Sequence, residues 1–370
     1  MKMTEPVQLL KAKTDNVLIT LEQIPTNESL TEEFASKTHT HDDIYASKTH
    51  THGDTYATNE TLTLYPTTED IHKQFNQIMT ALFDVKQAFG ISCSARFKDS
   101  KLTTININDP DAIDTSKVYS TYGMFQGCSK LTTLTDHNLW NLNLVENAND
   151  MFNGCSSLTE LNVGSWGFRS LRYAGSMFYN CSSLVRLNGI NNWTPMLVNA
   201  QRMFYGCSAL QSLTLGGFDM CNTTSCSEMF YNCSSLETLT GLENWTMSSV
   251  EFVNHMFDGC SALTTLDLKS WDLRKCRDIS YMFSYCSKLT ILYLNNWKLP
   301  EELGSGRIFE GCSSLTRVII NGAALKTFVN YSNSPMSINN VNSLENDVVY
   351  DCEGSVNDNG VFVINSTQKL

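Results

Sequence analysis

The chain repeats one stretch of sequence, and its clearest copy is residues 256–268, which read MFDGCSALTTLDL. Aligning the copies on Met-Phe and Cys gives eight units, each with one cysteine at the same place: Cys128, Cys155, Cys181, Cys207, Cys233, Cys260, Cys286 and Cys312. Neighbouring cysteines lie 26 or 27 residues apart. A period of roughly 20–50 residues kept through successive units is typical of a solenoid. We therefore expect one continuous core that is built by stacking the units.

Within each unit the spacing of the leucines predicts a short strand. Residues 263–273 read LTTLDLKSWDL, which fits the leucine-rich pattern L-x-x-L-x-L-x-x-N/C-x-L with tryptophan at the Asn/Cys position. The L-x-L pair predicts a strand whose alternate side chains point inward. The stretch before Met-Phe, such as residues 250–255, is expected to return the chain as a short helix or turn. We predict an α/β repeat fold, a leucine-rich-repeat solenoid with short strands and short helices or turns.

These units resemble BspA-like leucine-rich repeats, which carry the pattern Met-Phe-x-Gly-Cys-Ser-Ser-Leu-x-x-Leu. The resemblance covers about residues 97–325. It departs at Phe218, which replaces tryptophan, at Ile308, which replaces methionine, and in two units that carry one extra residue at Gly189 and Gly241. Members of this kind are associated with adhesion to host or cell surfaces, and the resemblance implies such a role here.

Both ends of the repeat array look different from its middle. Residues 97–107 read as a worn copy without its cysteine, as terminal repeats often do. Beyond the last unit, residues 347–350 and 361–364 are β-branched or aromatic and are separated by a glycine and an Asn-Gly turn signal, which predicts a closing β pair. We assign residues 91–325 to the solenoid and residues 326–370 to a C-terminal β cap.

The cysteines are expected to be reduced core residues. The chain has 13 of them, an odd number, and eight occupy one repeated position. A free cysteine behaves as a small buried hydrophobe. The repeated Gly-Cys-Ser therefore indicates packing, because a reactive thiolate needs a positive and accessible setting.

A second, shorter repeat lies near the N-terminus, where residues 35–45 read ASKTHTHDDIY and residues 46–56 read ASKTHTHGDTY. In an extended chain, residues i and i+2 point to the same side, so each His-Thr-His presents two imidazoles together. The segment resembles the Lys-Thr-His-Thr-His repeats in the shafts of bacteriophage tail fibres, which are trimers. In that family such forks meet on the threefold axis.

This resemblance implies a transition metal shared by three chains. Imidazole suits iron, zinc, nickel or copper, and six ligands around one ion make iron the first expectation, with zinc or nickel as further candidates. The predicted ligands are His39, His41, His50 and His52. The alternative is that these histidines pack or hydrogen-bond around the axis without a metal.

Residues 66–90 predict a coiled-coil stalk. After a helix start at residues 66–70, apolar residues follow at alternating steps of four and three, namely Ile71, Phe75, Ile78, Leu82, Val85 and Phe89. Gly90 is a stop signal. The pattern favours a trimer beside the fibre-like repeats, although an amphipathic helix lying on its own domain fits it too. Residues 1–34 would then form a virion-attachment segment and residues 35–65 the His-rich shaft.

Composition limits the classes of partner. The net charge is −12 and the pI is near 5.0, which argues against a general nucleic-acid partner, because proteins that bind nucleic acid usually show a basic patch. Only 17% of the residues are charged, so the surface is expected to make contacts through uncharged polar groups. The first ten residues lack the apolar run of a secretory signal, and no stretch reaches the roughly 18 apolar residues of a membrane span. We expect synthesis in the host cytoplasm without a signal peptide, no membrane insertion and no nucleic-acid partner.

We expect no enzymatic activity. His137 and His255 fall at different positions of their repeats and share no recurring carboxylate partner. Glu160, Glu237 and Asp267 could face one surface as a glycosidase pair requires, but spacing alone is weak evidence, and ordinary solvated strand residues are the favoured interpretation.

The candidate ligand-binding residues are the outward-facing positions of the predicted strands, because solenoids use such extended faces for binding. They are Glu160, Asn162, Arg186, Asn188, Gln211, Thr214, Glu237, Asp267, Tyr293 and Arg317. A glycan ligand fits the polar positions, while a protein ligand fits Tyr293 and Ile319 better. The alternative is that the loops make the contacts.

Together these features predict a trimeric phage tail fibre or receptor-binding adhesin in the virion tail. Its N-terminus would bind other virion tail proteins, and its leucine-rich-repeat arms would bind a host cell-surface glycan or protein. The alternatives are a structural virion decoration protein without receptor contact, a bacterial cell-surface adhesin, which would need export, and a depolymerase, which would need a catalytic set.

Overall fold

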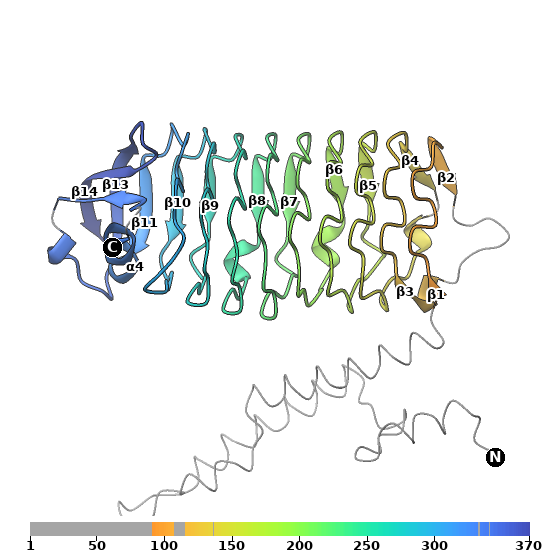
Figure 1. Ribbon diagram of the computed structural model, residues 1–370, viewed down its shortest axis with the longest axis horizontal. Helices are drawn as coiled ribbons and strands as arrows, with labels where there is room; N and C mark the ends of the chain where they lie inside the picture. The colour runs from red at the N-terminus through yellow and green to blue at the C-terminus, as the bar shows by residue number, and fades with distance from the viewer. Residues whose placement is uncertain (1–90, 107–114, 136, 332–333, 340) are drawn as a thin grey trace, which may run out of the picture. The chain divides into compact units, whose positions relative to one another are not determined.

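The structure, a computed structural model, describes residues 91–370 except residues 107–114, 136, 332–333 and 340. The described residues form a solenoid of short parallel β segments stacked along one axis (Figure 1). The predicted attachment segment, His-rich shaft and coiled coil, residues 1–90, lie outside the described residues. The four predicted metal ligands, His39, His41, His50 and His52, lie outside them as well.

One side of the solenoid is a ladder of short strands, which we call the strand ladder. Its members are β2 (Thr104–Asn106), β4 (Thr133–Thr135), β5 (Glu160–Asn162), β6 (Arg186–Asn188), β7 (Ser212–Thr214), β8 (Thr238–Thr240), β9 (Thr265–Asp267), β10 (Ile291–Leu294) and β11 (Arg317–Asn321). Parallel pairs join β2 to β4, β5 to β6, and β7 to β8, and β10 pairs with both β9 and β11. From β4 to β9 the middle residue of each strand is a buried leucine, so the expected inward L-x-L positions are confirmed.

A second ladder runs along the solenoid through single-residue bridges, and we call it the bridge ladder. Its residues pair in parallel, one per repeat: Ser120, Asn147, Tyr173, Asn199, Ser225, Phe252, Asp278 and Gly304. At its N-terminal end β1 (Ile91–Ser92) pairs with β3 (Val118–Ser120). Each bridge is followed by the Met-Phe turn, whose backbone N–H groups donate to carbonyls of the next repeat.

The expectation of an α/β repeat needs correction, because the repeats are mostly β. Within the described array the helices are single 3-10 turns: η3 (Thr115–Lys117), η4 (His137–Leu139), η5 (Ile190–Asn192) and η6 (Leu242–Asn244). In residues 252–256 Val253 and Met256 are buried, while His255 has a φ of 55°. Only isolated residues adopt such left-handed backbone, so the stretch runs as an extended bridge and a turn.

The two units with an extra residue use it for a 3-10 turn. Gly189 precedes η5 with φ 81°, and Gly241 precedes η6 with φ 93°. Both glycines adopt the left-handed conformation that glycine reaches without a Cβ penalty. The longer units therefore keep the register of the stacked core.

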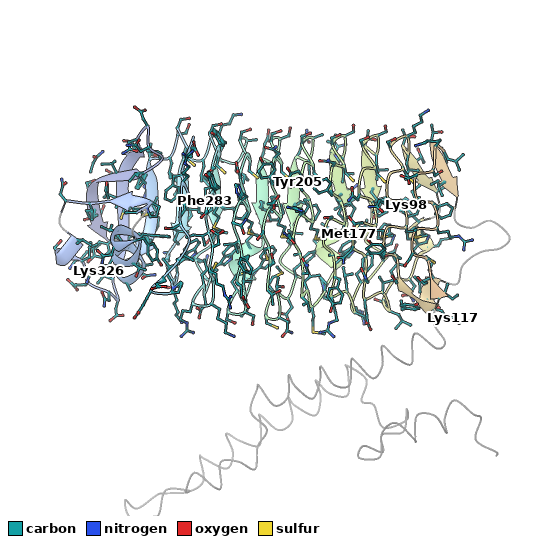
Figure 2. All side chains as sticks on the ribbon, in the orientation of Figure 1. Lys98, Lys117, Met177, Tyr205, Phe283 and Lys326 are labelled. Atoms are coloured by element: carbon teal, nitrogen blue, oxygen red, sulfur yellow. The ribbon has the colours of Figure 1, made fainter. Side chains whose placement is uncertain are left out.

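The core is a set of side-chain ladders that follow the sequence repeat. Eight phenylalanines from Phe125 to Phe309 stack at centroid distances of 5.0–5.8 Å with interplanar angles of 2–14°; Phe283 is labelled in Figure 2. Buried tryptophans form a parallel ladder, in which Trp193 Nε1 donates to Val163 O at 2.9 Å. The buried Met, Phe, Cys and Leu positions of the repeat are confirmed as core.

The eight repeated cysteines form a further ladder of buried thiols. Each Sγ donates to the phenylalanine carbonyl of the preceding repeat at 2.9–3.2 Å, as from Cys233 to Phe204 at 3.1 Å. Burial raises the pKa of Cys233 to about 12. All 13 cysteines of the chain are free, so the expected reduced core cysteines are confirmed.

The thiols should therefore react in a defined order with iodoacetamide. Cys221 is the one cysteine that is not buried, although burial of part of its side chain raises its pKa to about 11. We expect Cys221 to be alkylated first in the folded chain and the eight ladder cysteines only after unfolding, because only the thiolate is nucleophilic. Peptide mass spectrometry with and without urea measures this. Alkylation of Cys207 or Cys233 at the rate of Cys221 in the folded chain would contradict it.

Each Met-Phe turn places two residues in the left-handed region, one before the methionine and one before the cysteine. Before the cysteine most repeats have glycine or asparagine, as at Gly206 and Asn232. Tyr285 is the exception, with φ 56° and a side chain that is 54% exposed. Left-handed backbone costs about 1–2 kcal/mol for an ordinary residue, but much less for asparagine.

Tyr285→Asn is expected to raise the free energy of unfolding by about 0.5–1 kcal/mol, because it relieves this backbone strain at an exposed position. Urea unfolding measures the change. The reciprocal variant Asn232→Tyr, at the same turn position with φ 55°, should lower the free energy of unfolding by a similar amount. A loss of stability in Tyr285→Asn would show that ring contacts outweigh the strain.

The C-terminal residues continue the strand ladder as a mixed sheet. β13 (Val349–Val356) pairs antiparallel with β11 and with β14 (Phe362–Lys369), and β12 (Met336–Ser337) pairs with β14. The expected closing β pair is thus present. The helix α4 (Gly322–Asn330) follows β11 and is capped by Asn321, whose side chain accepts from Ala324 N at 2.9 Å. The short helix η7 (Val341–Ser343) precedes β13.

Candidate binding face

The predicted binding residues lie together on the outer side of the strand ladder. Register pairs Glu160 with Arg186 and Asn162 with Asn188 across β5 and β6. These four side chains are exposed, while Leu161 and Leu187 between them are buried. Paired residues in a sheet point to the same face, so the four form one polar patch. Asn188 Nδ2 donates to Glu160 Oε1 at 2.6 Å, which links the two strands.

The middle of the strand ladder carries mostly uncharged polar groups, with the carboxylate of Glu237 beside them. Gln211 and Glu237 occupy neighbouring repeats, where Glu237 N donates to Gln211 O at 2.9 Å, and both side chains are exposed. Thr214 and Thr240 are register partners in β7 and β8, with their hydroxyl oxygens 3.2 Å apart. Hydroxyl and amide groups can both donate and accept hydrogen bonds. This part of the face can therefore bind a polar ligand without charge complementarity.

Towards the C-terminus the face becomes half-buried and its charged groups are paired. Asp267 accepts from Lys269 Nζ at 3.0 Å, and Asp267 is the register partner of Tyr293. Arg317 forms an ion pair with Asp351 of β13. Arg317 therefore ties the C-terminal sheet to the solenoid.

Ile319, predicted to face outward, is buried with only 3% of its surface exposed. It lies in β11, which is an inner strand of the six-stranded sheet. Its register partners are Tyr293 on one side and Asp351 on the other. These neighbours flank the isoleucine on its own face, so Ile319 is not available to a protein ligand.

The three carboxylates named as a possible glycosidase pair lie at different places along the strand ladder. Glu160 accepts from Asn188, Asp267 from Lys269, and Glu237 lies outside the strand proper. One His–carboxylate pair was not predicted: His255 Nδ1 lies 2.7 Å from Asp258 Oδ2. Burial raises the pKa of Asp258, and the hydrogen bond to His255 opposes this.

Two further findings concern metal ions and membrane-spanning helices. No group of three or more His, Cys, Asp or Glu side chains in this part of the chain could hold a metal ion. None of the helices described between residues 91 and 370 has the length and apolar character needed to cross a membrane.

Comparison with protein families identifies the repeat array. Residues 91–215 and 198–321 match the family described as Mycoplasma protein of unknown function, DUF285. The chain belongs to this family. The match fits the expected BspA-like leucine-rich repeats at the level of a repeat solenoid. No curated protein matches the chain. The match begins at Ile91, so the tail-fibre resemblance of residues 35–56 stays a prediction.

The predictions made from the sequence did not include two surface features of this DUF285 array. One is a stack of aromatic rings on the Met-Phe turns, where Tyr205 lies 4.6 Å from both Tyr179 and Tyr231, and His255 lies 4.6 Å from Tyr281; Tyr205 is labelled in Figure 2. Because stacked rings cover each other, mainly their edges face solvent. The available signal was the tyrosine that directly follows Met-Phe in three consecutive repeats, at Tyr179, Tyr205 and Tyr231.

The other missed feature lies on the bridge ladder, at the residue four positions before each Met. Tyr173 and Phe252 occupy this position and are each 39% exposed. The sequence signal for this feature was a small or apolar residue three positions before each Met, as at Ala174 and Val253, which the structure shows to be buried. That alternation indicates extended chain, so the preceding residue faces out.

Proposed function

We propose that this chain is a trimeric receptor-binding adhesin of the phage tail-fibre type, which presents the outer face of its strand ladder to a host cell-surface glycan or protein. It acts in the virion tail and binds its ligand without catalysing a reaction. The observation that supports this best is the contrast between two sets of residues. The same buried residues recur in every repeat, whereas the exposed positions between them differ from repeat to repeat.

This contrast favours recognition over a purely structural role. The buried ladders fix the backbone, and the register places the exposed residues of neighbouring strands side by side. The spacing between parallel strands is about 4.8 Å, so the face offers a regular row of sites with a different side chain at each. A rigid row of this kind loses little conformational entropy on binding.

The binding face is testable with matched variants of the full chain. We expect Arg186→Ala and Tyr293→Ala each to weaken binding to host cells by roughly tenfold, as truncation of an interface arginine or tyrosine often does. Arg169→Ala and Tyr173→Ala are the controls, because both residues are exposed but lie off the strand ladder, whereas Arg186 is exposed and Tyr293 half-buried on it. Labelled protein and flow cytometry measure binding. Equal losses in controls and face variants would contradict the assignment, and binding to isolated tails but not to cells would favour a decoration protein.

The trimer and its metal rest on residues 35–90 alone. His39, His41, His50 and His52 would supply imidazole ligands from three chains to a transition metal, with iron first and zinc or nickel next. The mass of the particle in solution tests the trimer, and metal analysis of the wild type beside a His39→Ala/His41→Ala variant tests the site. A monomer would overturn both, while a trimer without bound metal would leave only packing histidines.

A further inference from the structure

A depression of about 520 Å³ lies on the bridge ladder, away from the strand ladder. This volume is within the roughly 300–1,000 Å³ of small-molecule sites. Ser225, a ladder residue between Asn199 and Phe252, lies within it. Its lining consists of one aromatic ring and six polar side chains: Gln201, Thr224, Ser225, Ser227, Glu251, Phe252 and Asn254.

The fold does not require the exposed aromatic ring of Phe252. Its backbone takes part in the ladder through bridges to Ser225 and Asp278. Other repeats place Asn199, Ser225 or Gly304 at the same position, so a large apolar side chain is not needed there. The face of an aromatic ring carries partial negative charge. It attracts the polarised C–H groups on the apolar face of a pyranose ring.

The polar groups beside the ring are held in place and retain free hydrogen-bonding capacity. Ser227, itself buried, donates its hydroxyl to Asn254 Oδ1 at 2.7 Å, which orients the amide and leaves Nδ2 as a donor. Among the residues that the structure describes, neither Asn254 Nδ2 nor the side-chain amide of Gln201 has a hydrogen-bond partner. Such amides complement vicinal hydroxyls, which both donate and accept.

The charge of the depression selects among saccharides. Glu251 is the one charged residue in the lining. Its Oε2 lies 3.1 Å from Arg277 Nε in an ion pair, and its other oxygen can accept from a ligand hydroxyl. Among the described residues, the lining contains no lysine or arginine that could pair with the carboxylate of an acidic sugar, so it favours a neutral one.

From these observations we propose that the depression beside Phe252 binds one neutral pyranose unit of a glycan. The ring of Phe252 stacks on the sugar, Gln201 and Asn254 donate to its oxygens, and Glu251 accepts from a hydroxyl. This site is distinct from the strand-ladder face and does not depend on the adhesin role proposed above. Arg186→Ala and Tyr293→Ala should leave it unchanged, so failure of one proposal is distinguishable from failure of the other.

Saturation-transfer NMR on the full chain tests this site directly. The probes are glucose, galactose, mannose and N-acetylglucosamine with their β-linked disaccharides, and glucuronate, sialic acid and choline as charged probes. We expect saturation transfer to the ring C–H protons of at least one neutral sugar. Phe252→Ala should weaken its binding by more than tenfold and Gln201→Ala by a smaller factor. Phe252→Trp should retain binding, because the larger ring keeps the stacking face.

The matched control is Tyr173→Ala, which removes an equally exposed aromatic ring at the same ladder position but outside the depression. It should bind the sugar as the wild type does, and thermal unfolding should show that all variants fold. Equal binding by wild type and Phe252→Ala, binding of only the charged probes, or no transfer to any neutral sugar would overturn the proposal.

Discussion

Phe230→Ala is expected to lower the free energy of unfolding by about 3–5 kcal/mol, the range found for large-to-small changes of buried aromatic residues. Phe230 is fully buried and stacks between Phe204 at 5.6 Å and Phe257 at 5.5 Å. Its removal leaves a cavity in the middle of the ladder, where both neighbours are held by their own repeats and cannot close in. Urea unfolding followed by circular dichroism measures the loss.

The matched control is Phe252→Ala, the same change at an exposed position one repeat further along. Because 39% of that side chain faces solvent and its bridge uses backbone atoms only, we expect a loss below about 1 kcal/mol. Similar losses in the two variants would mean that the phenylalanine ladder does not dominate the core. A solenoid couples mainly neighbouring repeats, so Phe230→Ala should also broaden the unfolding transition.

Gly241→Ala is expected to lower the free energy of unfolding by about 2–5 kcal/mol. Its φ of 93° costs an alanine about 1–2 kcal/mol, and a Cβ would lie 2.2 Å from Gly216 N. That neighbour is backbone of the preceding repeat and cannot rotate away, so overpacking adds about 1–3 kcal/mol. The two repeats must separate locally, which urea unfolding will register.

Gly216→Ala is the control for this effect, since it alters the other side of the same contact. A Cβ on Gly216 would meet Gly241 Cα at 3.5 Å, an ordinary contact distance. We expect a change of no more than about 1 kcal/mol. If Gly241→Ala were as mild as Gly216→Ala, the 3-10 turn η6 would have an alternative conformation that keeps the stack.

The core of this fold is readable from the sequence because it is periodic. Met256, Phe257, Cys260, Leu263 and Leu266 recur at fixed spacing, and a position that recurs in every stacked unit must face its own copies. The conformation of the segments between these positions is harder to predict. Residues 250–255 contain apolar residues at spacings that suit a helix, whereas the bridges at Phe252 and the left-handed backbone at His255 show that the chain is extended and then turns.

The candidate face shows the limit of reasoning within one repeat. Alternation along a strand correctly predicted that Glu160, Arg186 and Thr214 are exposed. The same reasoning was wrong for Ile319, which it predicted to be exposed. Ile319 is buried because β13, a strand about 30 residues further along the chain, pairs with β11. Likewise, the depression beside Phe252 is assembled from three consecutive repeats. Such features depend on which side chains the neighbouring repeats contribute, and the spacing of the repeats does not specify those side chains.

The hydrogen bonds between repeats have a mechanical consequence, because in both ladders they point along the solenoid axis. A force that pulls on the two ends of the array loads these contacts in series, so the weakest terminal repeat detaches first. Each detached repeat of 26 residues releases up to about 90 Å of extended chain. Under tension the array would therefore lengthen in steps and absorb the work of pulling, while the repeats still stacked stay intact.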